Sequence, residues 1–124
     1  MRGKFSVILI YRQMSPESPI FIEIKTFSMA FYFMAGISIR DREEYQRYLD
    51  GTDKVFAQYD GEYLAVDEHP EVLEGQWDSE RAVLIRFETK EDFEAWYRSD
   101  AYQEILKHRL KAAECNSILI RGKD

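Results

Sequence analysis

Several residue types are scarce in this 124-residue chain, and each scarcity excludes a class of protein. The single cysteine, Cys115, rules out an internal disulfide. The two histidines, His69 and His108, have no second histidine at metal-ligand spacing, so we expect no metal site. No apolar run approaches the roughly 20 residues that cross a bilayer, so we expect no membrane partner.

Clusters of basic residues are also missing. Lys and Arg number 17 against 23 Asp and Glu, which gives a formal net charge of −6, and the basic residues are dispersed singly. This distribution argues against a nucleic-acid partner, since phosphate binding draws on clustered cations. Glycine-rich phosphate loops and nucleophile elbows are absent, which excludes the usual nucleotide hydrolases and serine-type enzymes. We therefore expect a protein that uses no cofactor.

The first part of the chain differs in composition from the rest. Residues 1–28 carry four basic and two acidic residues, whereas the remainder carries 13 and 21. We therefore divide the chain into an N-terminal extension over residues 1–28, expected to be poorly ordered, and one domain over residues 29–124. The apolar stretch over residues 5–11 resembles a secretion signal but is short and lacks a cleavage site. We expect a cytoplasmic protein.

The domain has a recognisable order of elements. Hydrophobic residues make up 45% of the chain, and their spacing alternates between periods of two and 3.6. The pattern predicts a strand over 30–39, a helix from Asp41 to a stop at Gly61, and strands over 62–67 and 81–88. It then predicts a helix begun at Thr89, a helix begun at Ser99 with Cys115 late in it, and a strand over 116–121. This β-α-β-β-α-β order predicts an α+β, ferredoxin-like fold with a four-stranded antiparallel sheet and helices on one face.

The predicted strands are apolar on both faces, although helices cover only one. We expect the uncovered face to carry Tyr32, Met34, Leu84, Leu119 and Tyr63. Burying one such side chain contributes roughly 1.5–3 kcal/mol, and several together exceed an association cost of about 4–15 kcal/mol. The sequence therefore predicts a homodimer that pairs this face with itself about a two-fold axis.

Three motifs at fixed spacing are distinctive: Val-Leu-Glu-Gly-Gln-Trp over 72–77, Arg-Ala-Val-Leu-Ile-Arg-Phe over 81–87 and Ala-Trp-Tyr-Arg-Ser-Asp-Ala-Tyr-Gln over 95–103. Together they resemble the domain-of-unknown-function 1330 family, and the resemblance covers residues 29–122. It implies a small dimeric α+β barrel, an outline shared by cofactor-free monooxygenases, isomerases and chlorite-dismutase-like haem proteins. The chain departs from the family at Glu62 and Val66, where other members often have Arg.

Three charged residues are candidates for function. Arg86 points by alternation to the uncovered face, where it would anchor an anionic or carbonyl-bearing ligand or form a structural ion pair with Glu74 or Glu88. Arg81 begins the same strand and either holds a loop or faces a pocket mouth. Glu74 is a general base or a salt-bridge partner.

Aromatic residues supply the other candidates. Trp77 is either a lid over a pocket or an edge of the dimer interface, because tryptophan is enriched in both settings. Tyr48 and Tyr97 lie on core-facing stripes, where they pack or point into a cavity. The candidate catalytic residues are thus Glu74, Arg86 and Tyr48, and the candidate ligand-binding residues are Arg81, Arg86, Trp77, Tyr97 and Tyr48.

Two functions remain open from sequence. One is a homodimer that binds a small organic metabolite and acts on it without a cofactor, as an isomerase or a monooxygenase-like enzyme. The other is a non-catalytic dimeric binding or structural module. An enclosed pocket holding an arginine and a tyrosine or carboxylate favours the first.

Overall fold

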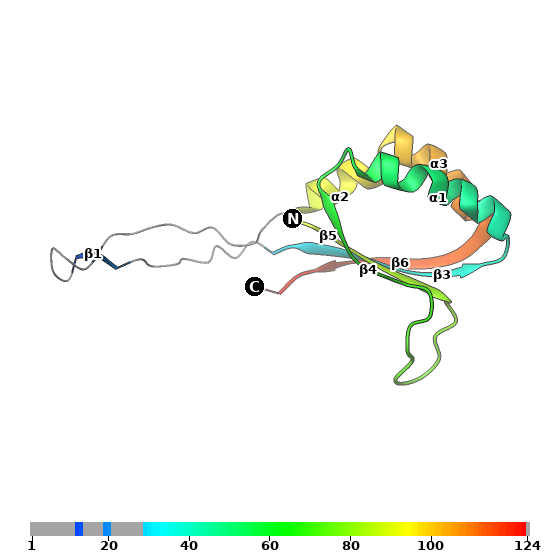
Figure 1. Ribbon diagram of the computed structural model, residues 1–124, viewed down its shortest axis with the longest axis horizontal. Coiled ribbons are helices and arrows are strands. Elements are labelled where there is room, and N and C mark those ends of the chain that lie inside the picture. The colour runs from blue at the N-terminus through cyan, green and yellow to red at the C-terminus, as the bar shows by residue number, and fades with distance from the viewer. Residues whose placement is uncertain (1–11, 14–18, 21–28, 124) are drawn as a thin grey trace.

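A computed structural model of the chain describes residues 12–13, 19–20 and 29–123. The described segment 29–123 contains four strands and three helices arranged as an α+β fold (Figure 1). Its elements are β3 (Phe31–Ile39), α1 (Arg42–Phe56), β4 (Gly61–Asp67), β5 (Arg81–Phe87), α2 (Lys90–Tyr97), α3 (Asp100–Ala112) and β6 (Ala113–Arg121). The four strands make an antiparallel sheet in the order β4-β5-β3-β6. The predicted fold class is confirmed.

Little of the N-terminal segment is described. β1 (Arg12–Gln13) and β2 (Pro19–Ile20) pair in antiparallel fashion. Apart from these four residues, the segment 1–28, which we expect to be poorly ordered, lies outside the described residues. The division of the chain at residue 29 stays a prediction. No helix among the described residues has the length and apolar character that a bilayer crossing requires.

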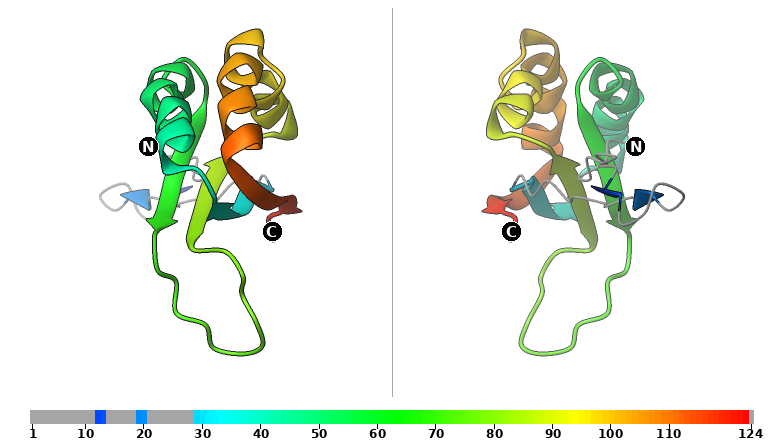
Figure 2. Two further views of the ribbon diagram at one scale, coloured as in Figure 1. Left: turned by 90° about the vertical axis from the view of Figure 1, so that its right-hand side faces the viewer. Right: turned by 90° about the vertical axis from the view of Figure 1, so that its left-hand side faces the viewer.

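The helices all lie on one side of the sheet. Figures 1 and 2 show α1, α2 and α3 above the strands, and no helix of the described residues lies on the opposite sheet face. This follows from the two crossover connections, which share one hand. The connection between β4 and β5, residues 68–80, extends beyond the uncovered face, and we call it the arm.

Helix starts are set by local side chains. Asp41, Thr89 and Ser99 occupy the N-cap positions of α1, α2 and α3, and each side chain accepts a hydrogen bond from the backbone N–H three residues later. Such caps satisfy N–H groups that have no partner within the helix. The sequence prediction of all three starts is confirmed.

Gly61 does not terminate α1 as predicted. The helix ends at Phe56, and Gly61 is the first residue of β4, without the left-handed backbone of a helix cap. A Cβ atom at Gly61 would lie 2.6 Å from ring atoms of both Phe56 and Phe87. The glycine is therefore required by close packing of two aromatic rings rather than by a turn.

The boundary between α3 and β6 also differs from the prediction. α3 ends at Ala112, and Cys115 lies in β6 opposite Ile37 rather than in a helix. Nine residues of β6 pair with β3, so the sheet ladder prevails over the helical pattern in this segment. The buried stripe of α3 includes Arg109 and leaves Leu110 63% exposed, although Leu110 stands at helical spacing from the buried Leu106.

The core between helices and sheet is aromatic. Trp96, Tyr102 and Phe87 are fully buried. Phe33, the third residue of β3, lies with its ring centre 5.7 Å from the ring centres of both Phe93 and Trp96. These contacts join α2 to the sheet and anchor the helical layer.

The uncovered face holds only part of the predicted set. Tyr32 and Met34 lie on it, with Leu84 opposite Met34, but the predictions for Leu119 and Tyr63 were wrong because both pack against the core. In the register of β6, Leu119 pairs with the core residue Phe33. Its neighbours instead occupy the uncovered face, as Ile118 and Ile120, and Ile118 is 57% exposed.

Two matched glycine substitutions test the packing at Gly61. Gly61→Ala is expected to lower the free energy of unfolding by about 1–3 kcal/mol, because rigid rings surround the new methyl group. Gly51→Ala is expected to cost less: its methyl group meets the Ile105 side chain, and a helical alanine gains about 1 kcal/mol over glycine. Urea unfolding at one protein concentration measures both. Equal losses would show that Gly61 is not a packing constraint.

Candidate functional site

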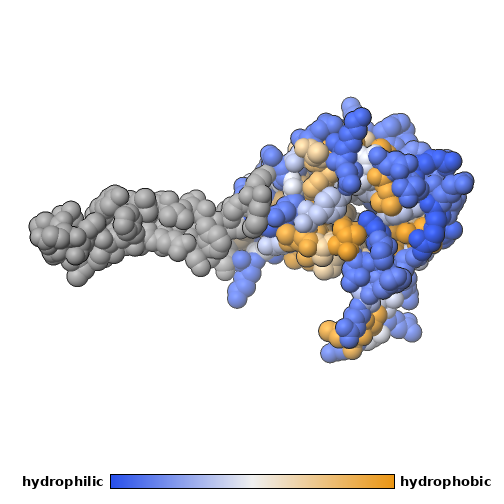
Figure 3. Space-filling view, in the orientation of Figure 1, coloured by the Kyte–Doolittle hydropathy of each residue, from blue (hydrophilic) through white to orange (hydrophobic). Residues whose placement is uncertain are grey.

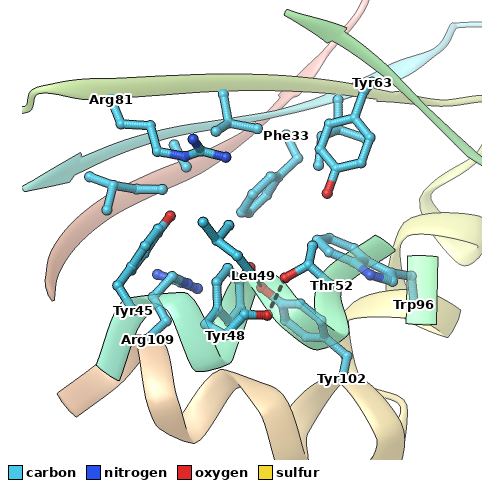
Figure 4. Close-up of a pocket in the computed structure, with 14 residues that line it drawn as sticks. Phe33, Tyr45, Tyr48, Leu49, Thr52, Tyr63, Arg81, Trp96, Tyr102 and Arg109 are labelled. Carbon is cyan, nitrogen blue, oxygen red and sulfur yellow. Dashed lines mark hydrogen bonds between the residues drawn. The ribbon is translucent and has the colours of Figure 1, made fainter. Parts of the chain in front are cut away.

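A small cavity lies between the helices and the sheet (Figure 4). Its volume is about 30 Å³, and we call it the inner cavity. Strands supply its roof and α1 and α3 its floor, as Figure 4 shows for Arg81 and Tyr63 on one side and Tyr45 and Arg109 on the other. The lining is Phe33, Ala35, Ile37, Tyr45, Tyr48, Leu49, Thr52, Tyr63, Arg81, Val83, Ile85, Trp96, Tyr102 and Arg109.

A larger pocket adjoins the inner cavity. This outer pocket has a volume of about 420 Å³ and shares three lining residues with the inner cavity, Tyr45, Leu49 and Arg81. Its full lining is Ile39, Arg42, Tyr45, Gln46, Leu49, Glu68, His69, Glu80 and Arg81. The three shared residues therefore form the boundary between the two spaces.

Arg81 is the cation at this boundary. It forms an ion pair with Glu68 at the base of the arm, and its guanidinium carbon lies 5.9 Å from the centre of the Tyr45 ring. The Arg81 Nε is buried and has no hydrogen-bond partner within the described part of the chain. Arg81 can therefore donate a further hydrogen bond to a group that enters from the outer pocket.

Arg109 is a second cation in the lining. Arg109 is only 4% exposed, and its guanidinium carbon lies 5.5 Å from the centre of the Tyr48 ring. Across residues 29–123, no carboxylate forms an ion pair with Arg109. Its electrostatic neighbours are instead Tyr102, Tyr48 and Cys115. A buried guanidinium without a carboxylate is uncommon, because burial of an uncompensated charge is costly.

Four tyrosines, Tyr45, Tyr48, Tyr63 and Tyr102, contribute to the lining of the inner cavity. The hydroxyls of Tyr48 and Tyr102 form a hydrogen bond of 2.8 Å. The Tyr45 hydroxyl is buried without a hydrogen-bond partner among the described residues. Burial raises the pKa of Tyr45 to about 12 and raises the pKa values of Tyr63 and Tyr102 further. These three phenols are therefore neutral hydroxyl groups near pH 7, not bases.

Two further charges in the outer pocket neutralise one another. Arg42 forms an ion pair with Glu80, whose other oxygen accepts a hydrogen bond of 3.0 Å from the backbone N–H of Ile39. This backbone bond is the largest cause that lowers the pKa of Glu80. The pair holds the start of α1 to the end of the arm.

Two of the predicted site residues meet at this site. Arg81 and Tyr48 both line the inner cavity, and Arg81 also lines the outer pocket. The expectation that Arg81 faces a pocket mouth matches this position. Tyr97 lies nearby but outside the lining, where its ring stacks on Phe93 with centres 5.2 Å apart.

The other predicted residues lie elsewhere. Arg86 is buried on the opposite side of the sheet, where it faces Glu62 across the strands at 3.8 Å. Glu74 and Trp77 belong to the arm and line a surface pocket there. A Cβ atom at Gly36 would lie 3.1 Å from the Trp77 ring, which places this ring over β3 on the uncovered face.

Sequence reasoning missed several lining residues. Tyr45, three residues before Tyr48, was not among the candidate site residues, nor were Trp96 and Tyr102. Arg109 carried a usable signal, because it stands at helical spacing from Leu106 and Tyr102, where a charge on an apolar stripe calls for an explanation. Thr52 and Tyr63 fit the helix and strand patterns of their segments, and nothing else in the sequence indicated that they line a site.

The described residues hold no group of three or more His, Cys, Asp and Glu side chains that could bind a metal ion. His108 instead forms a 2.6 Å contact with Glu44, which joins α3 to α1 and lowers the pKa of Glu44. His69 lines the outer pocket.

Solved structures with a similar fold share little sequence with this chain. A protein of unknown function from Rhodopseudomonas palustris is 17% identical, with a TM-score of 0.67 over 78% of this chain and 85% of its own. SnoaB, a cofactor-independent oxygenase from Streptomyces nogalater, is 10% identical, with a TM-score of 0.56 over 77% and 95%. A dimeric ferredoxin-like protein of unknown function from Thermobifida fusca is 11% identical, with a TM-score of 0.54 over 76% and 92%. At these identities the likeness shows the fold alone.

Comparison with curated proteins gave no match. The profile of the family described as "Domain of unknown function (DUF1330)" matches residues 30–123, which is most of the chain. The resemblance found in the three sequence motifs is thereby confirmed. The chain belongs to the DUF1330 family.

Proposed function

We propose that this protein is a homodimer that binds a small organic molecule through the outer pocket and the inner cavity, and acts on it without a cofactor. The observation that carries the binding proposal is a set of buried polar atoms that lack partners. Tyr45 Oη, Arg81 Nε and Trp96 Nε1 have no hydrogen-bond partner within the described residues, and all three residues line the inner cavity. Buried polar atoms are normally satisfied, so their convergence on one cavity supports a ligand there.

The outer pocket gives such a ligand a route. Its volume of about 420 Å³ falls within the roughly 300–1,000 Å³ typical of small-molecule sites. Tyr45, Leu49 and Arg81 separate it from the inner cavity, so a modest movement of these side chains joins the two spaces. Arg81 contacts the arm through Glu68, so ligand entry competes with that ion pair.

The second part of the proposal is that the protein converts the bound molecule without a cofactor. Guanidinium and phenol groups fixed around an oxygen atom stabilise negative charge that develops there during a reaction. This chemistry serves an isomerase or a monooxygenase-like reaction. The similar fold of SnoaB, described as a cofactor-independent oxygenase, supports the second of these.

The homodimer is proposed from the uncovered sheet face. Ile118, Ile120 and Met34 expose apolar surface there, and the arm adds Leu73, which is 84% exposed. Figure 3 shows apolar side chains at the tip of the arm. A second copy fits both patches at once, because a two-fold axis brings the same surface of each copy together. The fold similarity to a protein described as dimeric supports this arrangement.

A charge on the uncovered face is expected to disrupt the dimer. Ile118→Asp places a carboxylate in the proposed interface, where its desolvation opposes association. Leu110→Asp is the matched control: Leu110 is 63% exposed and lies on α3, across the sheet from that face. Sedimentation velocity should show a monomer for Ile118→Asp and a dimer for Leu110→Asp. An unchanged dimer in both variants would place the interface elsewhere.

Fluorescence of Trp96 tests ligand binding. The chain has two tryptophans, so Trp77→Phe leaves Trp96 in the cavity wall as the single reporter, and Trp96→Phe leaves Trp77 on the arm. Titration with a panel of small carbonyl compounds should give a saturable change in Trp77→Phe and none in Trp96→Phe. A change confined to Trp96→Phe would move the site to the arm. No change in either variant would favour the non-catalytic module.

A further inference from the structure

We infer that the ligand is an organic monoanion whose head group, of the size of a carboxylate, enters the inner cavity while its apolar body remains in the outer pocket. The inference rests on the proposed binding function and adds the chemical class of the ligand. Three observations carry it: the charge balance of the lining, the kind of hydrogen-bonding atom left without a partner, and the sizes of the two spaces.

The lining has an excess of one positive charge. Arg81 and Arg109 both line the inner cavity, whereas Glu68, the one carboxylate paired with either of them in the described residues, lies in the outer pocket. Arg42 and Glu80 pair with each other and leave this balance unchanged. Because a buried charge without a counter-charge is costly, a monoanion fits this lining better than a neutral ligand.

The buried polar atoms without a hydrogen-bond partner among the described residues also favour an anionic ligand. Arg81 Nε and Trp96 Nε1 are hydrogen-bond donors only, and the Tyr45 hydroxyl is available to donate. Three other hydroxyls of the lining already have partners: Thr52 donates to the Tyr48 carbonyl oxygen at 2.6 Å, and the hydroxyls of Tyr48 and Tyr102 bond to each other. An entering group must therefore accept hydrogen bonds, and an ionised carboxylate accepts without donating.

Tyr45 marks the place of the anionic oxygen. Its ring lies beneath the Arg81 guanidinium, and both Arg81 and Arg109 act on its hydroxyl electrostatically. Burial nevertheless raises the pKa of Tyr45 to about 12, so the hydroxyl keeps its proton. A ligand oxygen near Tyr45 Oη would receive a hydrogen bond and lie within reach of two cations.

The sizes of the two spaces divide the ligand into head and body. A buried water needs about 10–15 Å³, so the inner cavity, with about 30 Å³, holds roughly two atoms of oxygen size. This suits the two oxygens of a carboxylate and excludes a ring. The outer pocket, with about 420 Å³ and walls that include Ile39 and Leu49, accommodates a ring or a short chain.

Calorimetric titration of the full-length protein with benzoate and benzamide tests the inference. The two probes have nearly the same shape but differ in charge and in hydrogen-bond donors. Benzoate is expected to bind at least about tenfold more tightly, the difference typical of one charge-assisted hydrogen bond. Equal affinities, or tighter binding of benzamide, would overturn the inference.

Variants locate the effect. Arg81→Met and Tyr45→Phe are each expected to weaken benzoate binding about fivefold or more and to weaken benzamide binding less, because benzamide accepts a hydrogen bond but carries no charge. Tyr45→Phe removes a hydroxyl that has no partner within the described residues, so it should fold normally. Arg47→Met, which removes an exposed cation of α1 paired with Glu44, should change benzoate affinity less than about twofold because solvent screens its charge. A loss as large in Arg47→Met as in Arg81→Met would overturn the inference.

Failure of this inference differs from failure of the proposed function. If benzoate does not bind but neutral carbonyl compounds change Trp96 fluorescence, the anionic class is wrong and the binding function stands. If neither benzoate nor any neutral compound produces a response, both are wrong.

Discussion

The helices cover one face of the sheet, and the rest of the molecule depends on this one-sided layer. Its aromatic contacts, with Phe33 against Phe93 and Trp96, hold α2 on the sheet. In the same layer, tyrosine and arginine side chains bring polar groups between the helices and the sheet, and the inner cavity forms among them. The other face is left with Ile118 and Met34 exposed. The same constraint thus produces both a polar cavity on one side and an apolar surface on the other.

Local chemistry made most of the fold predictable. A short polar side chain at Asp41, Thr89 and Ser99 specifies a helix start without help from distant residues, and the sequence reveals it directly. Helix ends were harder to predict, because they depend on tertiary contacts. Gly61 is selected by two rings that converge in space, and the segment around Cys115 is drawn into β6 by its pairing with β3. Neither cause is visible in a single segment of sequence.

The site was only partly predictable, because it is assembled from elements far apart in the chain. Arg81 and Tyr48 were identified as candidates from their types and phases, and the fold brings them to one cavity. Arg109 was overlooked because its neighbour Leu110 fits the helical pattern better, although Leu110 faces outward. Arg86 belongs to the opposite face and Glu74 to the arm, since strand alternation and loop geometry separate them from the cavity.

The proposed function joins the two sides of the sheet: the cavity binds and acts on a ligand, and the uncovered face pairs two copies. The pairing is the more basic claim, since it follows from the apolar side chains that the uncovered face exposes in the described part of the chain. Sedimentation equilibrium of the wild-type protein over a wide dilution range tests it most directly. The account predicts the mass of two chains, with dissociation only at high dilution. A folded species with the mass of one chain at every concentration would contradict it.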